Sequence, residues 1–223
     1  SRIWGMIEII PSLLVESKDE FEKKLRLVEN DVQTIHVDVL DGTLFPFTNW
    51  FDARAVGAMR TKVNIELHLM VENPIPIIDA WKRHVKTMKR AIVHAEIDRP
   101  VGAMVKHIHD ECKLEAGVAL NPETPLSEIE DVLHNIEQLT IMGVHPGASG
   151  QSFEGDYVLD KITQAHHHCP ELPIEIDGGV TNKTIEPLVK AGANRICTAS
   201  LLFNSDDPIE ALKKLQKTIS TIK

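Results

Sequence analysis

Two short segments of the sequence place polar residues at alternate positions within runs that are otherwise apolar. In the first, His36 and Asp38 are separated by one apolar residue, and in the second, Glu66 and His68 are spaced in the same way. Residues two apart on a strand point to the same face of the sheet, so each pair projects to one side. Because an unpaired buried carboxylate costs free energy, both pairs indicate a chemical role.

A third carboxylate, Asp177, ends another apolar run and stands directly before a pair of glycines. We expect Asp177 to meet His36, Asp38 and His68 in one volume. Two imidazoles and two carboxylates suit a borderline divalent metal such as zinc or iron(II). The alternative for each residue alone is a hydrogen-bonded structural role, which the convergence of four residues from three strands disfavours.

The elements that must position these residues follow a repeating pattern. Short apolar runs typical of buried parallel strands cover residues 6–10, 34–40, 63–70, 91–95, 115–120, 139–144, 174–176 and 195–198. Amphipathic stretches typical of helices cover residues 20–29, 75–84, 101–110, 156–167, 182–191 and 208–222. Ser17 and Asp207 are predicted to cap the first and last of these helices.

Eight such units in 223 residues leave about 28 residues per unit, near the minimum for a βα repeat. The sequence therefore predicts an α/β fold, a (β/α)8 TIM barrel, with residues 1–223 as a single domain. An open doubly wound sheet is the alternative, but it usually carries a glycine-rich fingerprint after its first strand, and residues 10–13 have none.

A second group of residues follows the late strands, where a TIM barrel commonly builds a phosphate site. These residues are small, so backbone N–H groups can approach an anion closely. The group comprises Gly147, Ala148, Ser149, Gly150, Gly178, Gly179, Ala199 and Ser200. These segments contain no Lys or Arg, so the sequence predicts that backbone amides and helix ends hold the phosphate.

Composition excludes several classes of partner. The formal charge is −9 and only 4% of residues are aromatic, which argues against binding to nucleic acid or to an anionic membrane. No apolar run approaches the roughly 18 residues that a membrane helix needs. A small phosphorylated substrate remains compatible with this charge.

The cysteines and the histidine run carry weaker signals. Cys112, Cys169 and Cys197 are widely spaced and form no CxxC, so neither a disulfide framework nor a cysteine-type zinc site is indicated. A reducing, cytoplasmic location fits them best. Three consecutive residues cannot share one helix face, so the run at residues 166–168 is interpreted as a solvated helix end.

Five segments, in order along the chain, resemble the ribulose-phosphate 3-epimerase family. They are Ile-Pro-Ser at residues 10–12, His-Val-Asp-Val-Leu-Asp-Gly at 36–42, His-Leu-Met-Val-Glu-Asn-Pro at 68–74, Gly-Val-Ala-Leu-Asn-Pro-Glu-Thr-Pro at 117–125 and Asp-Gly-Gly-Val at 177–180. Members of that family are (β/α)8 barrels with one divalent metal. They interconvert D-ribulose 5-phosphate and D-xylulose 5-phosphate.

The resemblance implies roles for particular residues. His36, Asp38, His68 and Asp177 would be the metal ligands, with Asp38 and Asp177 also acting as the two acid/base groups on opposite faces of the substrate. The resemblance also implies the residues that bind the substrate. Ser12 would contact it near the reacting end, together with His36 and His68. Met70 and Met142 would form part of a sulfur-rich cap over it, and the eight small residues named above would surround the phosphate. The metal would be zinc, or else iron, manganese or cobalt. The protein would be a homo-oligomer, a dimer or larger.

The chain also departs from the family pattern. Leu40 stands where the family has Met, residues 145–151 read His-Pro-Gly-Ala-Ser-Gly-Gln where it has Asn-Pro-Gly-Phe-Gly-Gly-Gln, and Ala199 precedes Ser200 where it has Gly. These departures keep two alternatives open: a hexulose-phosphate 3-epimerase acting on allulose 6-phosphate, and a sugar-phosphate-binding barrel that has lost catalysis. A decarboxylase or aldolase on the same kind of barrel is disfavoured, because such relatives use Lys and acidic residues around magnesium.

Overall fold

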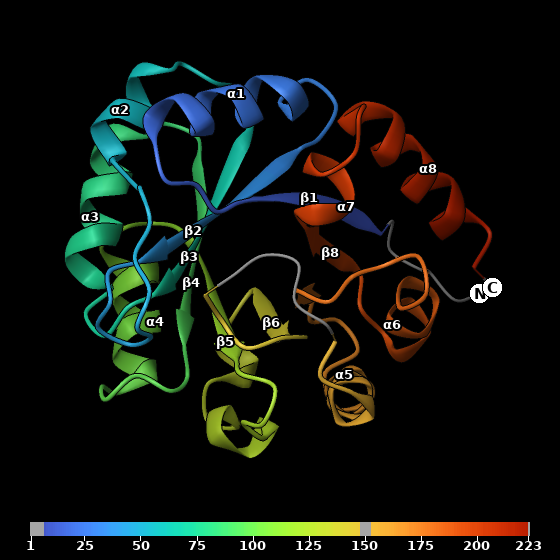
Figure 1. The fold of residues 1–223 in the computed structure, drawn as a ribbon. Helices are drawn as coiled ribbons and strands as arrows, with labels where there is room; N and C mark the ends of the chain where they lie inside the picture. Colours follow the sequence, from blue (N-terminus) through green and yellow to red (C-terminus); the bar gives the residue numbers. More distant parts are fainter. Residues whose placement is uncertain (1–6, 148–152, 223) are drawn as a thin grey trace.

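The computed structural model describes residues 7–147 and 153–222. Its centre is a closed barrel of eight parallel strands that pair in chain order, and the last strand pairs with the first (Figure 1). The strands are β1 (Glu8–Leu13), β2 (Thr34–Leu40), β3 (Asn64–Met70), β4 (Met88–His94), β5 (Glu115–Leu120), β6 (Gln138–Met142), β7 (Ile174–Asp177) and β8 (Arg195–Thr198). The predicted (β/α)8 fold class is confirmed.

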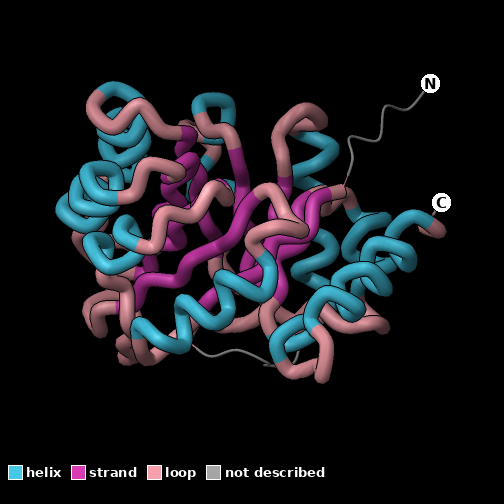
Figure 2. Tube along the Cα trace, turned by 90° about the horizontal axis from the view of Figure 1, so that it is seen from above, coloured by secondary structure: helices cyan, strands magenta, loops and turns pink. Residues whose placement is uncertain are grey.

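Helices surround the strands on the outside of the barrel (Figure 2). They are α1 (Lys18–Val28), α2 (Ala53–Ala58), α3 (Ile75–His84), α4 (Val101–Asp110), α5 (Asp156–His168), α6 (Ile185–Ala191), α7 (Ser200–Phe203) and α8 (Pro208–Ser220). Between β5 and β6 the chain forms only two 3₁₀ turns, η1 (Leu126–Ile129) and η2 (Leu133–Asn135). The short α2 and α7 were not predicted, because six and four residues are too few to show a helical apolar period.

Both predicted helix caps are confirmed. The Ser17 side chain accepts the N–H of Glu20 at 3.1 Å at the start of α1. Asp207 accepts the N–H groups of Ile209 and Glu210 at the start of α8, each at 3.1 Å. These bonds satisfy backbone donors that the first turn of a helix leaves without an intrahelical acceptor.

Two strands differ from their predicted ranges by three residues at one end, and β3, β6 and β7 differ by only one or two. β1 continues through Pro11 to Leu13, because Pro11 keeps its place in register beside Thr198 of β8. β4 begins at Met88, three residues earlier than predicted, and so contains Arg90. A charged residue at that position interrupts the apolar run in the sequence although it is fully buried in the fold.

Alternation along β2 shows how the barrel separates its two faces. Ile35, Val37 and Val39 are almost completely buried within the hydrophobic core that lies between strands and helices. His36 and Asp38 face the barrel interior, and the parallel register places Asp38 beside His68 of β3. The polar residues of the strands therefore converge inside the barrel.

Candidate active site

Four side chains converge inside the barrel at the carboxyl ends of β2, β3 and β7. His36 Nε2 lies 3.1 Å from Asp38 Oδ1, 3.1 Å from His68 Nδ1 and 3.3 Å from Asp177 Oδ2. His68 Nδ1 lies 3.0 Å from Asp38 Oδ1 and 3.2 Å from Asp177 Oδ2. Ligands about 2.1 Å from a tetrahedral metal would be about 3.4 Å apart. The spacing of these atoms matches the edges of such a coordination shell.

Hydrogen bonds behind the two histidines direct their lone pairs toward the same point. Nδ1 of His36 lies 2.7 Å from Glu66 Oε1, so its N–H donates to that carboxylate and Nε2 is left as an acceptor. Nε2 of His68 lies 2.8 Å from Nε2 of His94, whose Nδ1 faces Glu96 at 3.2 Å. When His94 donates from Nδ1 and accepts from His68, Nδ1 of His68 is free to coordinate. Such outer partners orient histidine ligands in metal sites, so the donor set fits a metal ion.

The electrostatics of the group favour a cation at its centre. Burial disfavours the charged imidazolium of His36, but Cys197, Asp177 and Glu175 outweigh it and raise the pKa of His36 well above its usual value. Burial opposes ionisation of Asp38 and Asp177, yet His36 and His68 lower the pKa of both carboxyls. These shifts favour the carboxylate forms, which suit the binding of positive charge.

A buried ionic layer lies beneath these four residues. Arg90 and Glu66 are fully buried, and Arg90 Nε donates to Glu66 Oε2 at 2.9 Å. Burial and the adjacent Glu66 raise the pKa of Glu175 well above its usual value. Thr140 donates to Glu175 at 3.0 Å. Arg90 therefore balances the charge of Glu66, while burial disfavours ionisation of the second acid.

The structure places most of the predicted substrate-binding residues around one pocket above the four-residue group. Of the predicted residues, the pocket is lined by Ser12, Asp38, Met70, Met142, Gly147, Asp177, Gly178, Gly179, Ala199 and Ser200. His36 and His68 are fully buried and lie behind Asp38 rather than in the pocket wall. Ser12 also donates to Asp38 Oδ2 at 3.1 Å and orients that carboxylate.

The glycines of the pocket have steric reasons for their identity. Gly178 and Gly179 adopt φ angles of +90° and +73°, which L side chains rarely adopt. A Cβ on Gly178 would lie 2.4 Å from Val144 Cγ2, and one on Gly147 would lie 2.3 Å from the ring of Phe47. The predicted positions Ala148, Ser149 and Gly150 lie outside the described residues.

Several residues around the site received no role from the sequence. Thr181, Cys197 and Thr198 line the pocket. Arg90 lies in the layer beneath it and could have been found only from the inward face of β4, which begins three residues before its predicted start. Glu175 lies in the same layer at a predicted strand end, but the partners that define its role are remote in the sequence. His145, at the pocket rim, faces Glu123 and Glu154 at 2.9 and 3.1 Å.

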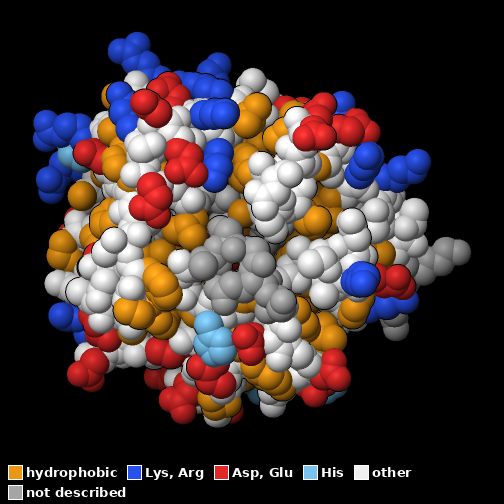
Figure 3. All heavy atoms as spheres, in the orientation of Figure 1, with side chains coloured by type: hydrophobic (Ala, Val, Ile, Leu, Met, Phe, Trp, Pro, Cys, Tyr) orange, Lys and Arg blue, Asp and Glu red, His pale blue; other side chains and the backbone are white. Residues whose placement is uncertain are grey.

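The described part of the chain combines apolar and charged surface. Among the described residues, no helix is long and apolar enough to cross a membrane. On the face in Figure 3, hydrophobic side chains lie around the centre and charged ones of both signs lie toward the periphery. The apolar segment at residues 43–51 packs in part against the barrel, with Phe45 edge-on to His94 at 5.5 Å and Trp50 against Phe21 at 5.6 Å.

Comparison with known proteins gives concordant results in sequence and fold. A model of the Ribulose-phosphate 3 epimerase family matches residues 8–203. The chain is 31% identical to ribulose-phosphate 3-epimerase of Bacillus subtilis (strain 168) over 219 residues, 95% of this chain and 99% of that protein. It is 34% identical to the chloroplastic ribulose-5-phosphate-3-epimerase of Arabidopsis thaliana over 224 residues, 94% of this chain and 76% of that protein.

Among solved structures, the chain is similar to 3-hexulose-6-phosphate synthase from Salmonella typhimurium, with a TM-score of 0.73, 13% identity, and coverage of 97% of this chain and 100% of that chain. At this identity the likeness shows the barrel fold alone. The family match, in contrast, spans β2, β3 and β7, the strands that carry the four converging side chains. It confirms the enzyme class expected from the sequence: the chain belongs to the ribulose-phosphate 3-epimerase family.

Proposed function

We propose that this chain interconverts D-ribulose 5-phosphate and D-xylulose 5-phosphate by metal-dependent epimerisation at C3. The observation that carries the proposal is the group of His36, Asp38, His68 and Asp177, with nearest donor atoms 3.0–3.3 Å apart at the base of a pocket. Family membership supports the same reaction. The two named curated relatives are ribulose-phosphate epimerases.

Inversion beside a ketone needs a proton removed from one face of the carbon and returned to the other. Asp38 lies on β2 and Asp177 on β7, and β1 and β8 stand between them in the barrel wall. Each carboxylate therefore approaches the pocket from a different side. One carboxylate takes the C3 proton, and the electron pair moves to the carbonyl oxygen to give an enediolate. The other group enters this step as the protonated acid and delivers its proton to the opposite face.

The metal is held by His36, Asp38, His68 and Asp177, and we propose that it is zinc. When bound, the ion supplies positive charge that stabilises the negative charge developing on the substrate oxygens. Ser12 holds Asp38 Oδ2 at 3.1 Å, which leaves Oδ1 directed at the two histidines. The buried acid and base groups beneath the site keep the ligands in place and exclude water from that side.

The small residues of the pocket wall hold the phosphate. Gly178, Gly179, Ala199 and Ser200 line the pocket, and none of the described residues that line it is Lys or Arg. Backbone N–H groups are the remaining donors for an anion there. Met70 and Met142, which end β3 and β6, cover the apolar side of the sugar.

The test is solvent deuterium exchange at C3 with purified, metal-loaded protein. Ribulose 5-phosphate should exchange and turn over, and allulose 6-phosphate should do so more slowly. Asp177→Asn and Asp38→Asn should each lower exchange by about 10²–10⁴-fold, the usual contribution of a positioned acid or base. Asp52→Asn is the matched control, because Asp52 is an exposed cap of α2 whose role an amide oxygen can fill.

Three results would contradict the proposal. The first is no exchange with either sugar phosphate at full metal occupancy, which would favour a binding barrel without catalysis. The second is faster turnover of the hexulose phosphate, which would change the substrate. The third is undiminished exchange in Asp177→Asn, which would remove Asp177 from the reaction.

A further inference from the structure

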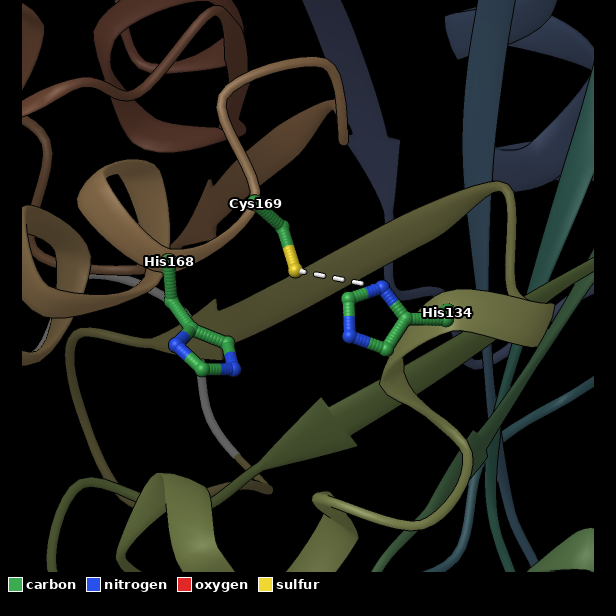
Figure 4. A group of neighbouring side chains, drawn as sticks. All are labelled: His134, His168 and Cys169. Atoms are coloured by element: carbon green, nitrogen blue, oxygen red, sulfur yellow. Dashed lines mark hydrogen bonds between the residues drawn. The ribbon is translucent and has the colours of Figure 1, made fainter.

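A second group of metal-ligating side chains lies at the opposite end of the barrel from the pocket. His134 belongs to η2, just before β6, while His168 ends α5 and Cys169 follows it, before β7. Figure 4 shows the Cys169 sulfur and the two imidazole rings facing a common space. These residues adjoin the amino ends of their strands, whereas the candidate active site adjoins the carboxyl ends.

The separations suit coordination of one ion by all three residues. One ligand atom from each lies within 4.8 Å of the others. Cys169 Sγ is 3.8 Å from Nδ1 of His134, and the ring centroids of His134 and His168 are 6.0 Å apart. In a tetrahedral zinc site the sulfur–nitrogen and nitrogen–nitrogen separations are about 3.6 and 3.4 Å, from bond lengths of about 2.3 and 2.1 Å. Both histidines are exposed and free to make the small adjustment.

The partners of these residues distinguish this group from another cysteine–histidine cluster in the fold. In the cluster of Asp79, His107 and Cys112, the carboxylate faces His107 at 2.8 Å and accepts from Cys112 at 3.4 Å, so its donors are already satisfied. Among the described residues, neither His134 nor His168 has a carboxylate partner. Within the described residues, no carboxylate therefore competes with a metal ion for the two imidazoles.

We propose that His134, His168 and Cys169 form a second metal site that binds zinc. One thiolate and two imidazoles are the donors that zinc prefers over magnesium or calcium, and three protein ligands leave a fourth position for water. The three residues border an open surface hollow, which gives that position room. A bound ion would link η2, which lies in the β5–β6 connection that has no α-helix, to the end of α5.

The experiment uses Co²⁺ as the probe with the full chain after metal removal. A cobalt–thiolate bond gives a near-ultraviolet sulfur-to-cobalt charge-transfer band, which the histidine and aspartate ligands of the active site cannot produce. We expect two equivalents of Co²⁺ to bind and the band to accompany one of them. Added Zn²⁺ should abolish the band by displacement.

Variants identify the ligands. Cys169→Ser should lose the band, and His134→Gln and His168→Gln should each weaken the binding that produces it at least tenfold, the typical cost of disturbing a metal's ligand environment. Cys112→Ser and His167→Gln are the matched controls and should keep the band unchanged. Each of the three ligand variants should keep its C3 exchange rate, because it leaves the active site intact.

Stability gives a readout that needs no cobalt. With free zinc about 100-fold above the dissociation constant of this site, linkage predicts that binding at this site raises the melting temperature by about 5–10 °C. That contribution should disappear in Cys169→Ser. An absent charge-transfer band, a band that survives in Cys169→Ser, or a band lost in Cys112→Ser would each overturn the proposal.

Discussion

The buried arginine beneath the active site provides a quantitative test of how the barrel interior is held together. Arg90 is fully buried and its guanidinium contacts Glu66, through Nε at 2.9 Å and Nη2 at 2.8 Å, and Glu115. Arg90→Met keeps a long apolar side chain but leaves the carboxylate of Glu66 without its cation. Removing one partner of a buried ion pair costs about 3–5 kcal/mol.

In a protein of this size, each kcal/mol lowers the melting temperature by about 2–4 °C. We therefore expect Arg90→Met to melt about 6–20 °C lower, measured by calorimetry or circular dichroism. Lys89→Met is the matched control, because it removes a positive charge from the adjacent position of β4, which is only half-buried. That substitution should change the free energy of unfolding by less than about 1 kcal/mol.

The pH dependence tests the assigned cause. Burial opposes ionisation of Glu66, but neighbours that include Glu175, His36 and Arg90 lower its pKa, so it stabilises the fold above its unfolded pKa and loses that contribution as pH falls. Without Arg90, one of the attractions that lower the pKa of Glu66 is lost, so Glu66 takes up a proton at a higher pH than in the unmodified protein. The deficit of Arg90→Met should therefore shrink as pH falls and Glu66 is protonated. A loss below about 1 kcal/mol, or a deficit independent of pH, would refute this reasoning.

Four further predictions concern the helices and the metal. Ser17→Ala should cost about 1 kcal/mol in the free energy of unfolding, because it removes the cap of α1; an unchanged urea midpoint would contradict this. Gly57→Ala should cost about 1–3 kcal/mol, since its Cβ would lie 2.1 Å from the His84 carbonyl oxygen. Gly102→Ala, with only a 3.5 Å side-chain contact inside α4, should instead stabilise the protein by about 1 kcal/mol. Dialysis against a chelator should abolish C3 exchange, and added Zn²⁺ should restore it with an unchanged far-ultraviolet spectrum.

The sequence allowed the four-residue group to be predicted because strand geometry is regular. Alternation along residues 36–38 and 66–68 places every second side chain inside the barrel, and chain order in a (β/α)8 fold brings the strand ends together. The parallel register that sets Asp38 beside His68 follows from the same regularity. The cost of burying an unpaired carboxylate then marked these inward positions as chemically important.

The supporting residues could not be predicted because their roles depend on partners far away in the chain. Arg90 follows another basic residue, a pattern typical of exposed positions. Its partner Glu66 lies 24 positions away on the neighbouring strand, so the sequence alone does not indicate the ion pair. Glu175 was visible at a strand end, but its raised pKa depends on burial and on Glu66 across the barrel. In the same way, the proposed metal site joins His134 to the adjacent residues His168 and Cys169. Cys169 lies 35 positions after His134, so no short spacing motif marks the site.

Closure of the barrel has a consequence for how the site comes into existence. Asp38 and Asp177 belong to strands that do not pair with each other; β8 and β1 lie between them, joined by the register of Ile9 with Ile196. A chain that has formed β1 to β6 holds three of the four proposed ligands and no complete coordination shell. Under the proposed function, affinity for the ion would depend on the pairing of β7 with β8 and of β8 with β1, and metal binding and barrel closure would reinforce each other during folding.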